Sequence, residues 1–368
     1  MAELCRRYAI SRPTGYKWVD RFETAGAAGL GERSRRPHGC SRETPSDVAG
    51  AVLELRRKHP FWGPKKLLTV LRRRQPQGAW PARSTVADLL ARHGLVDRRR
   101  RRTYPGHPGK PTQSMDAPND TWCIDFKGEF KTGDGPYCYP LTVTDGCSRF
   151  ILSCQGLRST AHVGAQPVLQ KLFQEYGLPA IMRSDNGVPF ATTAIGRLSR
   201  LSIWWIRLGI YPELIEPGHP EQNGRHERMH KTLKQETTRP PAGTLRGQQR
   251  RFDRFRAECN QERPHEALDQ DTPASRYRPS SRACPSRLPP IEYPAHFETR
   301  LMSRNGGFRW ASRWVSLSHL LAGQYVGLEE VDDGIWDVYY SYVRLGQMDE
   351  RTHQVEDALG RLMRNPKV

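Results

Sequence analysis

Three acidic side chains stand in sequence contexts that could support metal-ion chemistry. Asp125 lies within segment 121–128, which has the apolar pattern of a β-strand, and Asp185 directly follows the short strand pattern of 180–184. Glu227 lies near the start of a helical pattern. Three carboxylates around one point would repel each other unless they hold divalent cations, which prefer oxygen ligands. Such a group predicts a site for divalent cations.

Each of these acids also has an ordinary structural interpretation when it is considered alone. Asp125 could be a paired structural acid, and Asp185-Asn186-Gly187 is good turn chemistry. A glutamate near a helix start is most often a solvated partner of the helix dipole. Two strand-borne acids followed by a helix-borne acid are much less expected by chance, and this order favours a joint role.

The helix that carries Glu227 also presents two lysines. A Pro- and Gly-rich loop, residues 217–223, precedes the helix, and Asn223 can cap it. Lys231 and Lys234 follow Glu227 at i+4 and i+7, so the pattern predicts all three on one face. Ordinary ion pairing of Glu227 with Lys231 is the structural interpretation of this spacing.

The motifs around these acids resemble the Asp-Asp-Glu signature of the retroviral integrase superfamily. They are Trp122-x-x-Asp125, Ser184-Asp185-Asn186-Gly187 and Pro217-x-x-Pro220-x-Gln222-Asn223-Gly224-x-x-Glu227-Arg228. Within that superfamily, bacterial insertion-sequence transposases with an integrase core are the most similar. The resemblance covers roughly residues 116–275 and implies a ribonuclease H-like catalytic core.

The resemblance also implies a reaction, a cofactor and partners. Asp125, Asp185 and Glu227 would be the catalytic residues and would hold two Mg²⁺ or Mn²⁺ ions. The implied reaction is hydrolysis at transposon ends, followed by attack of the freed 3′-hydroxyl on target DNA, so the partner is double-stranded DNA. Family members with the same Glu-x-x-x-Lys-x-x-Lys spacing use the lysines, here Lys231 and Lys234, to hold DNA. Joining two ends implies a homo-oligomer, at least a dimer on DNA.

Three other acids compete for a place in the site. Asp145 is followed by a hairpin-like turn, so we interpret it as structural. Glu129 lies in the first strand pattern, and Glu221 lies in the loop before the helix of Glu227. Glu221 therefore stays open as the alternative third ligand.

The elements that must position these acids alternate between strands and helices. We expect strands at 121–130, 137–145, 149–156, 180–184 and 210–215, and helices at 161–176, 192–208, 224–236 and 244–262. Three consecutive strands followed by alternating helix and strand predict an α/β core with a mixed sheet and helices on both faces. This core is expected at 120–275.

Two helical units are expected before the core. Residues 1–44 resemble a partial helix-turn-helix with a basic loop, and residues 45–96 resemble a second helix-turn-helix. The first unit would read DNA through Ser11, Arg12, Thr14 and Lys17. An ordinary helical hairpin is the alternative for that unit.

Positive charge is concentrated in the amino-terminal third. Residues 1–112 contain 25 Lys and Arg against 9 Asp and Glu, which accounts for +16 of the formal net charge of +19. The linker at 97–119 contains an unbroken arginine run: Arg98, Arg99, Arg100, Arg101 and Arg102. Adjacent guanidinium groups repel each other and gain from phosphate contacts, so the run predicts DNA binding, a solvated tether, or both.

A small β domain is expected after a Pro-rich linker at 276–295. Residues 296–350 alternate apolar and polar, and Asp333-Gly334 is a hairpin signal, so we predict a small β-barrel before a tail at 351–368. Four aromatic residues fit its core better than a base-stacking surface: Trp310, Trp314, Trp336 and Tyr340.

Cysteine spacing and hydropathy favour a cytoplasmic, nucleoid-associated protein. The eight cysteines form no Cys-x-x-Cys pair or zinc-finger spacing, and the sequence shows no signal peptide or apolar run of membrane length. Two functions remain open: a metal-dependent transposase, and a DNA-binding regulator with an inactive core. A ribonuclease H-type RNA nuclease is disfavoured by the helical units and the basic arm.

Overall fold

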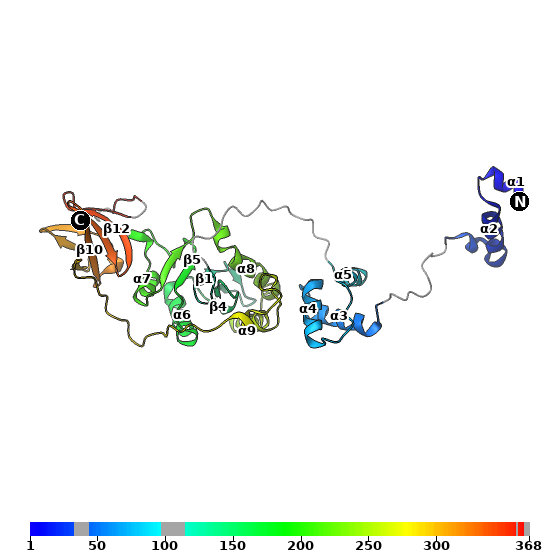
Figure 1. Cartoon of the computed structure of the whole chain (residues 1–368), viewed down its shortest axis with the longest axis horizontal. Helices are drawn as coiled ribbons and strands as arrows, with labels where there is room; N and C mark the ends of the chain where they lie inside the picture. Colours follow the sequence, from blue (N-terminus) through cyan, green and yellow to red (C-terminus); the bar gives the residue numbers. More distant parts are fainter. Residues whose placement is uncertain (33–43, 97–114, 358–359, 364–368) are drawn as a thin grey trace.

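The computed structural model describes residues 1–32, 44–96, 115–357 and 360–363 (Figure 1). The described residues up to 96 form helical units, those of the central part are mixed α/β, and those near the carboxyl end are all-β. The arginine run at 98–102 lies outside the described residues. None of the described helices is long and apolar enough to cross a membrane.

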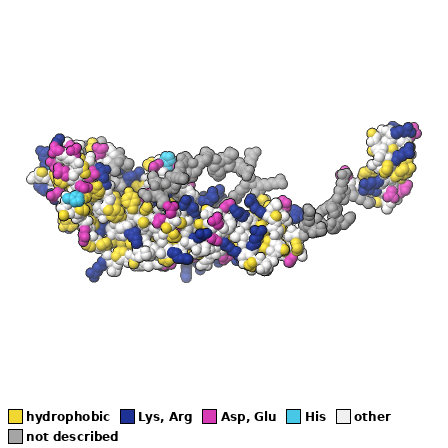
Figure 2. Space-filling view, in the orientation of Figure 1, with side chains coloured by type: hydrophobic (Ala, Val, Ile, Leu, Met, Phe, Trp, Pro, Cys, Tyr) yellow, Lys and Arg dark blue, Asp and Glu magenta, His cyan; other side chains and the backbone are white. Residues whose placement is uncertain are grey.

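The first helical unit leaves its apolar stripe open to solvent. Its elements are α1 (Ala2–Arg7), α2 (Arg12–Ala25) and the 3-10 turn η1 (Gly26–Leu30). Ser11 caps α2 as expected, because its hydroxyl accepts a hydrogen bond from the backbone N–H of Thr14 at 3.3 Å. Tyr16, Val19 and Phe22 on α2 are 59%, 37% and 52% exposed, and Figure 2 shows hydrophobic side chains at the surface of this unit. Two short helices cannot enclose such a stripe.

The second helical unit is a three-helix bundle with a core of its own. Its helices are α3 (Ser46–Lys58), α4 (Pro64–Arg74) and α5 (Arg83–Arg92). Pro64 opens α4, where a missing backbone N–H has no cost. The buried apolar side chains recur at helical spacing and include Val52, Leu55, Leu67, Leu71, Val86 and Leu90. The three helices expected from the sequence are therefore present.

The α/β part is built on a mixed sheet. Its strands are β1 (Thr121–Phe126), β2 (Phe130–Lys131), β3 (Tyr137–Asp145), β4 (Ile151–Leu157), β5 (Ile181–Ser184) and β6 (Tyr211–Leu214). β1 pairs antiparallel with β3 and parallel with β5, β6 is parallel to β5, and β4 covers the other edge of β3. The predicted strand at 121–130 is interrupted at 127–129, where Gly128 adopts a φ of 81° that suits glycine.

Helices cover both faces of this sheet (Figure 1). They are α6 (His162–Tyr176), α7 (Arg200–Arg207), α8 (Gly224–Thr237), α9 (Leu245–Gln261) and the short α10 (Pro273–Arg276). Trp122 and Ile124 of β1 share a core with α6 and α7, whereas α8 and α9 pack on the opposite face around Phe252. Because side chains alternate along a strand, Cys123 and Asp125 are directed toward α8 and α9.

The helix predicted at 192–208 begins later than expected. It starts at Arg200 as α7, after the 3-10 turn η2 (Ile195–Arg197). Ser199 and Ser202 form a reciprocal capping box that fixes this start, and Gly196 has a φ of 57° that interrupts the helix before it.

The carboxyl-terminal part is a small antiparallel β domain. Its strands are β7 (Glu298–Leu301), β8 (Gly307–Trp310), β9 (Arg313–Ser316), β10 (Tyr325–Asp332), β11 (Ile335–Tyr340), β12 (Val343–Asp349) and β13 (Gln354–Asp357). Five form a sheet in the order β13-β12-β11-β10-β7, with the predicted hairpin at Asp333-Gly334. The β8–β9 hairpin contacts β7 and β13. No pairing between β7 and β13 occurs within the described residues, so the predicted barrel closure is not observed.

Two details of this domain differ from the sequence-based expectation. Trp310 and Tyr340 are buried and Trp336 is half-buried, but Trp314 is 38% exposed because it alternates with the buried Val315 on β9. Strand β13 also continues the domain beyond residue 350, since it pairs with β12.

The α/β part is joined to both neighbours by side-chain contacts. The core of the β domain includes three residues of the α/β part: Ile195, Leu198 and Ile206. The α3–α5 bundle contacts α9 and the segment after it. His59 Nδ1 lies 2.9 Å from Glu258 Oε1, and Lys65 Nζ lies 2.7 Å from Glu266 Oε1.

Candidate active site

Asp125 lies on β1, on the face of the sheet that α8 covers. Its partner in the strand register is Thr142 of β3, and its side chain is 22% exposed. Burial, then the charge of Asp185 and, more weakly, that of Glu227 raise the pKa of Asp125 to about 7. The three acids singled out in the sequence therefore lie close enough for their charges to act on one another.

Asp185 stands at the carboxyl end of β5. Because β5 runs parallel to β1, the ends of the two strands bring Asp185 and Asp125 to the same edge of the sheet. Asp185 Oδ1 accepts a hydrogen bond from the backbone N–H of Gly187 at 3.2 Å. The turn interpretation of Asp185 is thus compatible with a role in a site.

The rival acids have other partners. His219 Nδ1 lies 2.7 Å from Glu221 Oε1 in the loop before α8. Asp145 is buried and accepts hydrogen bonds from the backbone N–H of Asn119 at 2.7 Å and from the hydroxyl of Ser148 at 2.6 Å. Asp145 is therefore structural, as expected.

The donor chemistry of the three acids fits a hard divalent cation. Their carboxylates offer oxygen ligands, and a cation such as Mg²⁺ or Mn²⁺ would offset both the burial of Asp125 and the charges of Asp185 and Glu227 that raise its pKa. Among the described residues, no three His, Cys, Asp or Glu side chains are grouped closely enough to hold one ion. The three acids therefore lie at one edge of the sheet, but their carboxylates do not converge on a single point.

A basic groove adjoins Glu227. Its volume is about 350 Å³, and it is lined by Lys127, Glu227, Lys231, Lys234, Gln235 and Arg239. Burial, and then the charge of Lys234, lower the pKa of Lys127. Lys231 and Lys234 therefore share one groove with Glu227, and a phosphate bound there would meet several cationic side chains beside the acid.

Two buried histidines of α8 were not identified from the sequence. His226 Nε2 and His230 Nε2 lie 2.7 Å and 2.6 Å from the hydroxyl oxygen of Thr142, and His226 Nδ1 lies 2.8 Å from that of Thr144. The Thr142 hydroxyl also donates to the backbone carbonyl of Asp125 at 3.1 Å. The pair therefore fixes α8 to the strands at the level of Asp125.

The sequence contained a signal for this histidine pair. The buried positions of α8 are His226, His230, Leu233 and Thr237, which follow the spacing of one helical face. Burial lowers the pKa of His226 to about 3 and lowers the pKa of His230 strongly. Both rings are therefore neutral at physiological pH. As a polar residue, histidine does not stand out in an apolar pattern, although a neutral ring with hydrogen-bond partners is readily buried.

The remaining candidate residues are separate from this edge of the sheet. Arg12 and Lys17 are exposed in the first half of α2, and the hydroxyls of Ser11 and Thr14 lie 2.8 Å apart. Residues 98–102 lie outside the described residues. The structure brings together the three acids and the two lysines of α8, but not these amino-terminal residues.

Three family models match the chain. Residues 115–220 and 208–273 each match an integrase core domain, and residues 14–90 match a homeodomain-like domain. The integrase matches cover the β1–β6 sheet together with α8 and α9. The homeodomain-like match spans parts of both helical units.

Retroviral proteins are similar to this chain over a shorter stretch. The Gag-Pol polyprotein of baboon endogenous virus (strain M7) is 33% identical over 131 residues, which is 36% of this chain and 7% of the polyprotein. The Pol polyprotein of feline endogenous virus ECE1 is also 33% identical over 131 residues, 36% of this chain and 12% of that polyprotein. The chain thus spans a small part of the length of these relatives.

Solved structures similar to the chain include the catalytic core domain of BIV integrase, at 19% identity and a TM-score of 0.34. That similarity covers 43% of this chain and 93% of the BIV domain. Because two integrase models together span residues 115–273 and retroviral Pol proteins match at about one-third identity, the sequence comparisons agree. Residues 115–273 are therefore similar to integrase core domains, the domain type of the retroviral integrase superfamily, and they follow a region similar to a homeodomain-like domain.

Proposed function

We propose that the chain is a transposase of the bacterial insertion-sequence type, which binds the ends of a mobile DNA element and catalyses metal-dependent cleavage and strand transfer. The observation that carries the proposal is that the parallel strands β1 and β5 bring Asp125 and Asp185 to one edge of the sheet, where the charge of Glu227 on α8 also acts on Asp125. Structural acids are usually paired with cations, whereas the charges of Asp185 and Glu227 add to the effect of burial in raising the pKa of Asp125.

In this proposal, Asp125, Asp185 and Glu227 hold Mg²⁺ or Mn²⁺. Two such ions, when bound, would activate the attacking oxygen and stabilise the leaving oxygen of a phosphodiester. The basic groove beside Glu227 would hold the neighbouring phosphates and orient the strand. The His226–His230 pair would keep α8, and with it Glu227, at a fixed distance from β1. Double-stranded DNA is the partner, and a homo-oligomer joins two ends.

The test is cleavage of labelled DNA that carries the element's end, with and without Mg²⁺. The wild-type protein should nick this DNA only with the metal. Asp125→Asn, Asp185→Asn and Glu227→Gln should lose nicking by at least two orders of magnitude and retain end binding, because the substitutions remove charge at nearly constant size. Glu221→Gln should remain active.

Two outcomes would contradict the proposal. Binding without nicking by the wild-type protein would favour a DNA-binding regulator with an inactive core. Loss of nicking in Glu221→Gln together with full activity in Glu227→Gln would mean that Glu221 is the third ligand.

A further inference from the structure

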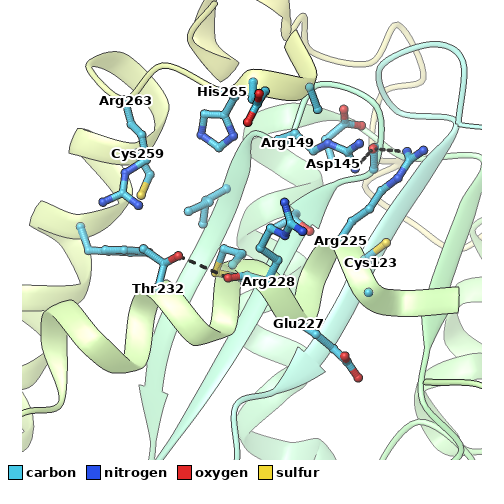
Figure 3. A pocket seen from close by; sticks show the side chains of 18 of the residues that line it. Cys123, Asp145, Arg149, Arg225, Glu227, Arg228, Thr232, Cys259, Arg263 and His265 are labelled. Atoms are coloured by element: carbon cyan, nitrogen blue, oxygen red, sulfur yellow. Dashed lines mark hydrogen bonds between the residues drawn. The ribbon is translucent and has the colours of Figure 1, made fainter. Parts of the chain in front are cut away.

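A second pocket lies behind α8, between this helix, α9 and the turn after β3 (Figure 3). Its volume is about 760 Å³. We call it the cation pocket after four of its lining residues: Lys66, Arg149, Arg225 and Arg228. Lys66 comes from α4 of the helical bundle, and the others come from the α/β part, so the pocket is completed by contact between the two parts.

The four cations lack matching acids. Arg149 and Arg225 each donate to the backbone carbonyl of Gly146 at 3.0 Å, and neither forms an ion pair among the described residues. The guanidinium of Arg228 forms no hydrogen bond or ion pair with any described residue, and Figure 3 shows it directed into the pocket. The ammonium of Lys66 likewise has no ion pair within the described part of the chain.

The acids near the pocket are engaged elsewhere. Asp145 accepts hydrogen bonds from its own turn, and Glu221 Oε1 lies 2.7 Å from His219. Glu266 pairs with Lys65 at 2.7 Å. The carboxylate of Glu227 is directed away from the pocket (Figure 3). Among the described residues, none of these acids forms an ion pair with Lys66, Arg149, Arg225 or Arg228, although the charges of Glu266 and Asp145 act on Lys66 and Arg149 from a distance.

Two further residues that can carry positive charge line the pocket, Arg263 and His265. Arg263 is paired with Glu236, so it does not add free positive charge. The buried Nε2 of His265 has no hydrogen-bond partner, and its ring is directed into the pocket (Figure 3). An unpartnered polar atom that is buried beside uncompensated cations indicates that an anion belongs there.

The charges of the pocket act strongly on one another. Burial, and then the charge of Arg225, lower the pKa of Arg149 to about 10. Burial, and then the charge of Arg263, lower the pKa of Lys66. Burial, followed by the charges of Lys66 and Arg263, lowers the pKa of His265 to about 4. An anion would relieve this repulsion, and guanidinium groups suit phosphate oxygens in particular.

We propose that the cation pocket binds phosphate groups of a DNA strand, separately from the phosphate held beside Glu227. The volume exceeds what a single phosphate needs, and the cations are spread over α4, α8 and the β3–β4 turn rather than converging on one point. Glu227 borders both the cation pocket and the basic groove, so a DNA strand leaving the groove can continue into the pocket. This inference rests on the proposed function only in its choice of DNA.

The test is DNA binding by the full chain across a salt series, without Mg²⁺. The variants are Arg228→Gln, which removes a guanidinium without a hydrogen bond or ion pair among the described residues, and the double variant Arg225→Gln/Arg228→Gln. Arg254→Gln is the control, because Arg254 is exposed on α9 outside the pocket. Fluorescence anisotropy of a labelled duplex of arbitrary sequence gives the slope of log affinity against log salt.

Each lost phosphate contact should reduce that slope by about 0.9 and weaken binding roughly tenfold at low salt. We expect this for Arg228→Gln, about twice the slope change for the double variant, and no change for Arg254→Gln. Circular dichroism checks that the variants are folded. Lys66→Gln, which alters a different helix, should reduce the slope in the same way.

Unchanged slopes in Arg228→Gln and Lys66→Gln would overturn the proposal. A parallel arm uses inorganic phosphate: thermal stabilisation of wild type but not of the double variant, with unchanged DNA slopes, would assign the pocket to a free anion and also overturn it. Because no metal is present, a catalytically inactive wild-type protein would leave this result intact.

Discussion

At the scale of single residues, the histidine pair beneath α8 connects the helix of Glu227 to the strand of Asp125. Both rings contact the hydroxyl of Thr142, and this hydroxyl also donates to the backbone of Asp125. Neutral imidazole suits this arrangement, because it offers one donor and one acceptor without the cost of burying a charge. The pair therefore makes the geometry of the acidic edge depend on the protonation of buried groups.

His226 predicts how the stability of the fold depends on pH. Its pKa is lowered to about 3 in the folded protein, whereas an unfolded histidine titrates near 6.5. The unfolded state thus binds more protons below about pH 6.5, and the stability contributed above that pH is lost as pH falls toward 3, by about 1.4 kcal/mol per pH unit. The variant His226→Gln should be less stable than wild type at pH 7, and the difference should shrink as pH falls.

Urea unfolding of wild type and His226→Gln at pH 7, 6 and 5 measures this difference. The control is His93→Gln, since His93 is exposed at the end of α5. A constant difference between His226→Gln and wild type at all three pH values would show that His226 is not held neutral in the folded protein.

At the scale of elements, three faces of α8 contact three different parts of the structure: the sheet, the basic groove and the cation pocket. His226, His230 and Leu233 are buried against the sheet. Glu227 and the two lysines after it line the basic groove, and Arg225 and Arg228 line the cation pocket. One helix therefore packs on the sheet and carries both an acid of the candidate site and residues of two cationic surfaces. Its orientation determines where all of these side chains lie.

The lysine face of α8 should determine how tightly DNA is held near the cut. The double variant Lys231→Ala/Lys234→Ala should flatten the salt slope of end binding by roughly two contacts, about 1.8 in total, on DNA of any sequence. Nicking should fall as well, because the phosphate is less well positioned. Ordinary helical pairing with Glu227 would give only about 0.3–0.5 kcal/mol and no change in slope.

Anisotropy titrations and nicking assays on the same DNA check this expectation. Lys171→Ala is the matched control, since Lys171 is exposed on α6. Full-strength binding and nicking by the Lys231→Ala/Lys234→Ala variant would exclude the basic groove as a DNA contact.

At the scale of the whole molecule, most of the net charge and the candidate acids lie in different parts of the chain, which side-chain contacts hold together. The amino-terminal 112 residues carry +16 of the formal charge of +19, while the α/β part supplies the acids. The α3–α5 bundle is attached to the α/β part by ionic contacts such as Lys65 to Glu266 and Arg73 to Asp271 at 3.1 Å. Exposed ion pairs are weak, so the bundle's attachment should respond to salt more than the apolar contacts of the β domain do.

Removal of residues 1–112 should abolish preference for the element's ends and reduce the salt slope of residual binding by several contacts. Both helical units and most of the net charge leave with this segment, and so does Lys66 of the cation pocket. Removal of residues 1–44 alone should reduce end preference but retain the bundle. An unchanged salt slope after the longer deletion would mean that the basic third does not contact DNA.

The sequence by itself determined the elements and the order of the acids. Strand periodicity located β3 and β5 within a residue or so, and the alternation of β1 already separated Trp122 and Ile124 from Asp125. Local signals succeed here because strand alternation, Pro and Gly breaks and helix caps act over only a few residues. The Ser11 cap and the Asp333-Gly334 hairpin were predictable for the same reason.

Only the tertiary structure decided what each helix face meets. The contact of His226 with Thr142, the four cations around one pocket and the docking of Lys65 on Glu266 join residues far apart in the sequence. Such contacts depend on how helices cross the sheet, which no local pattern encodes. The same limit explains the exposed Trp314, because burial of one strand face depends on which element packs against it.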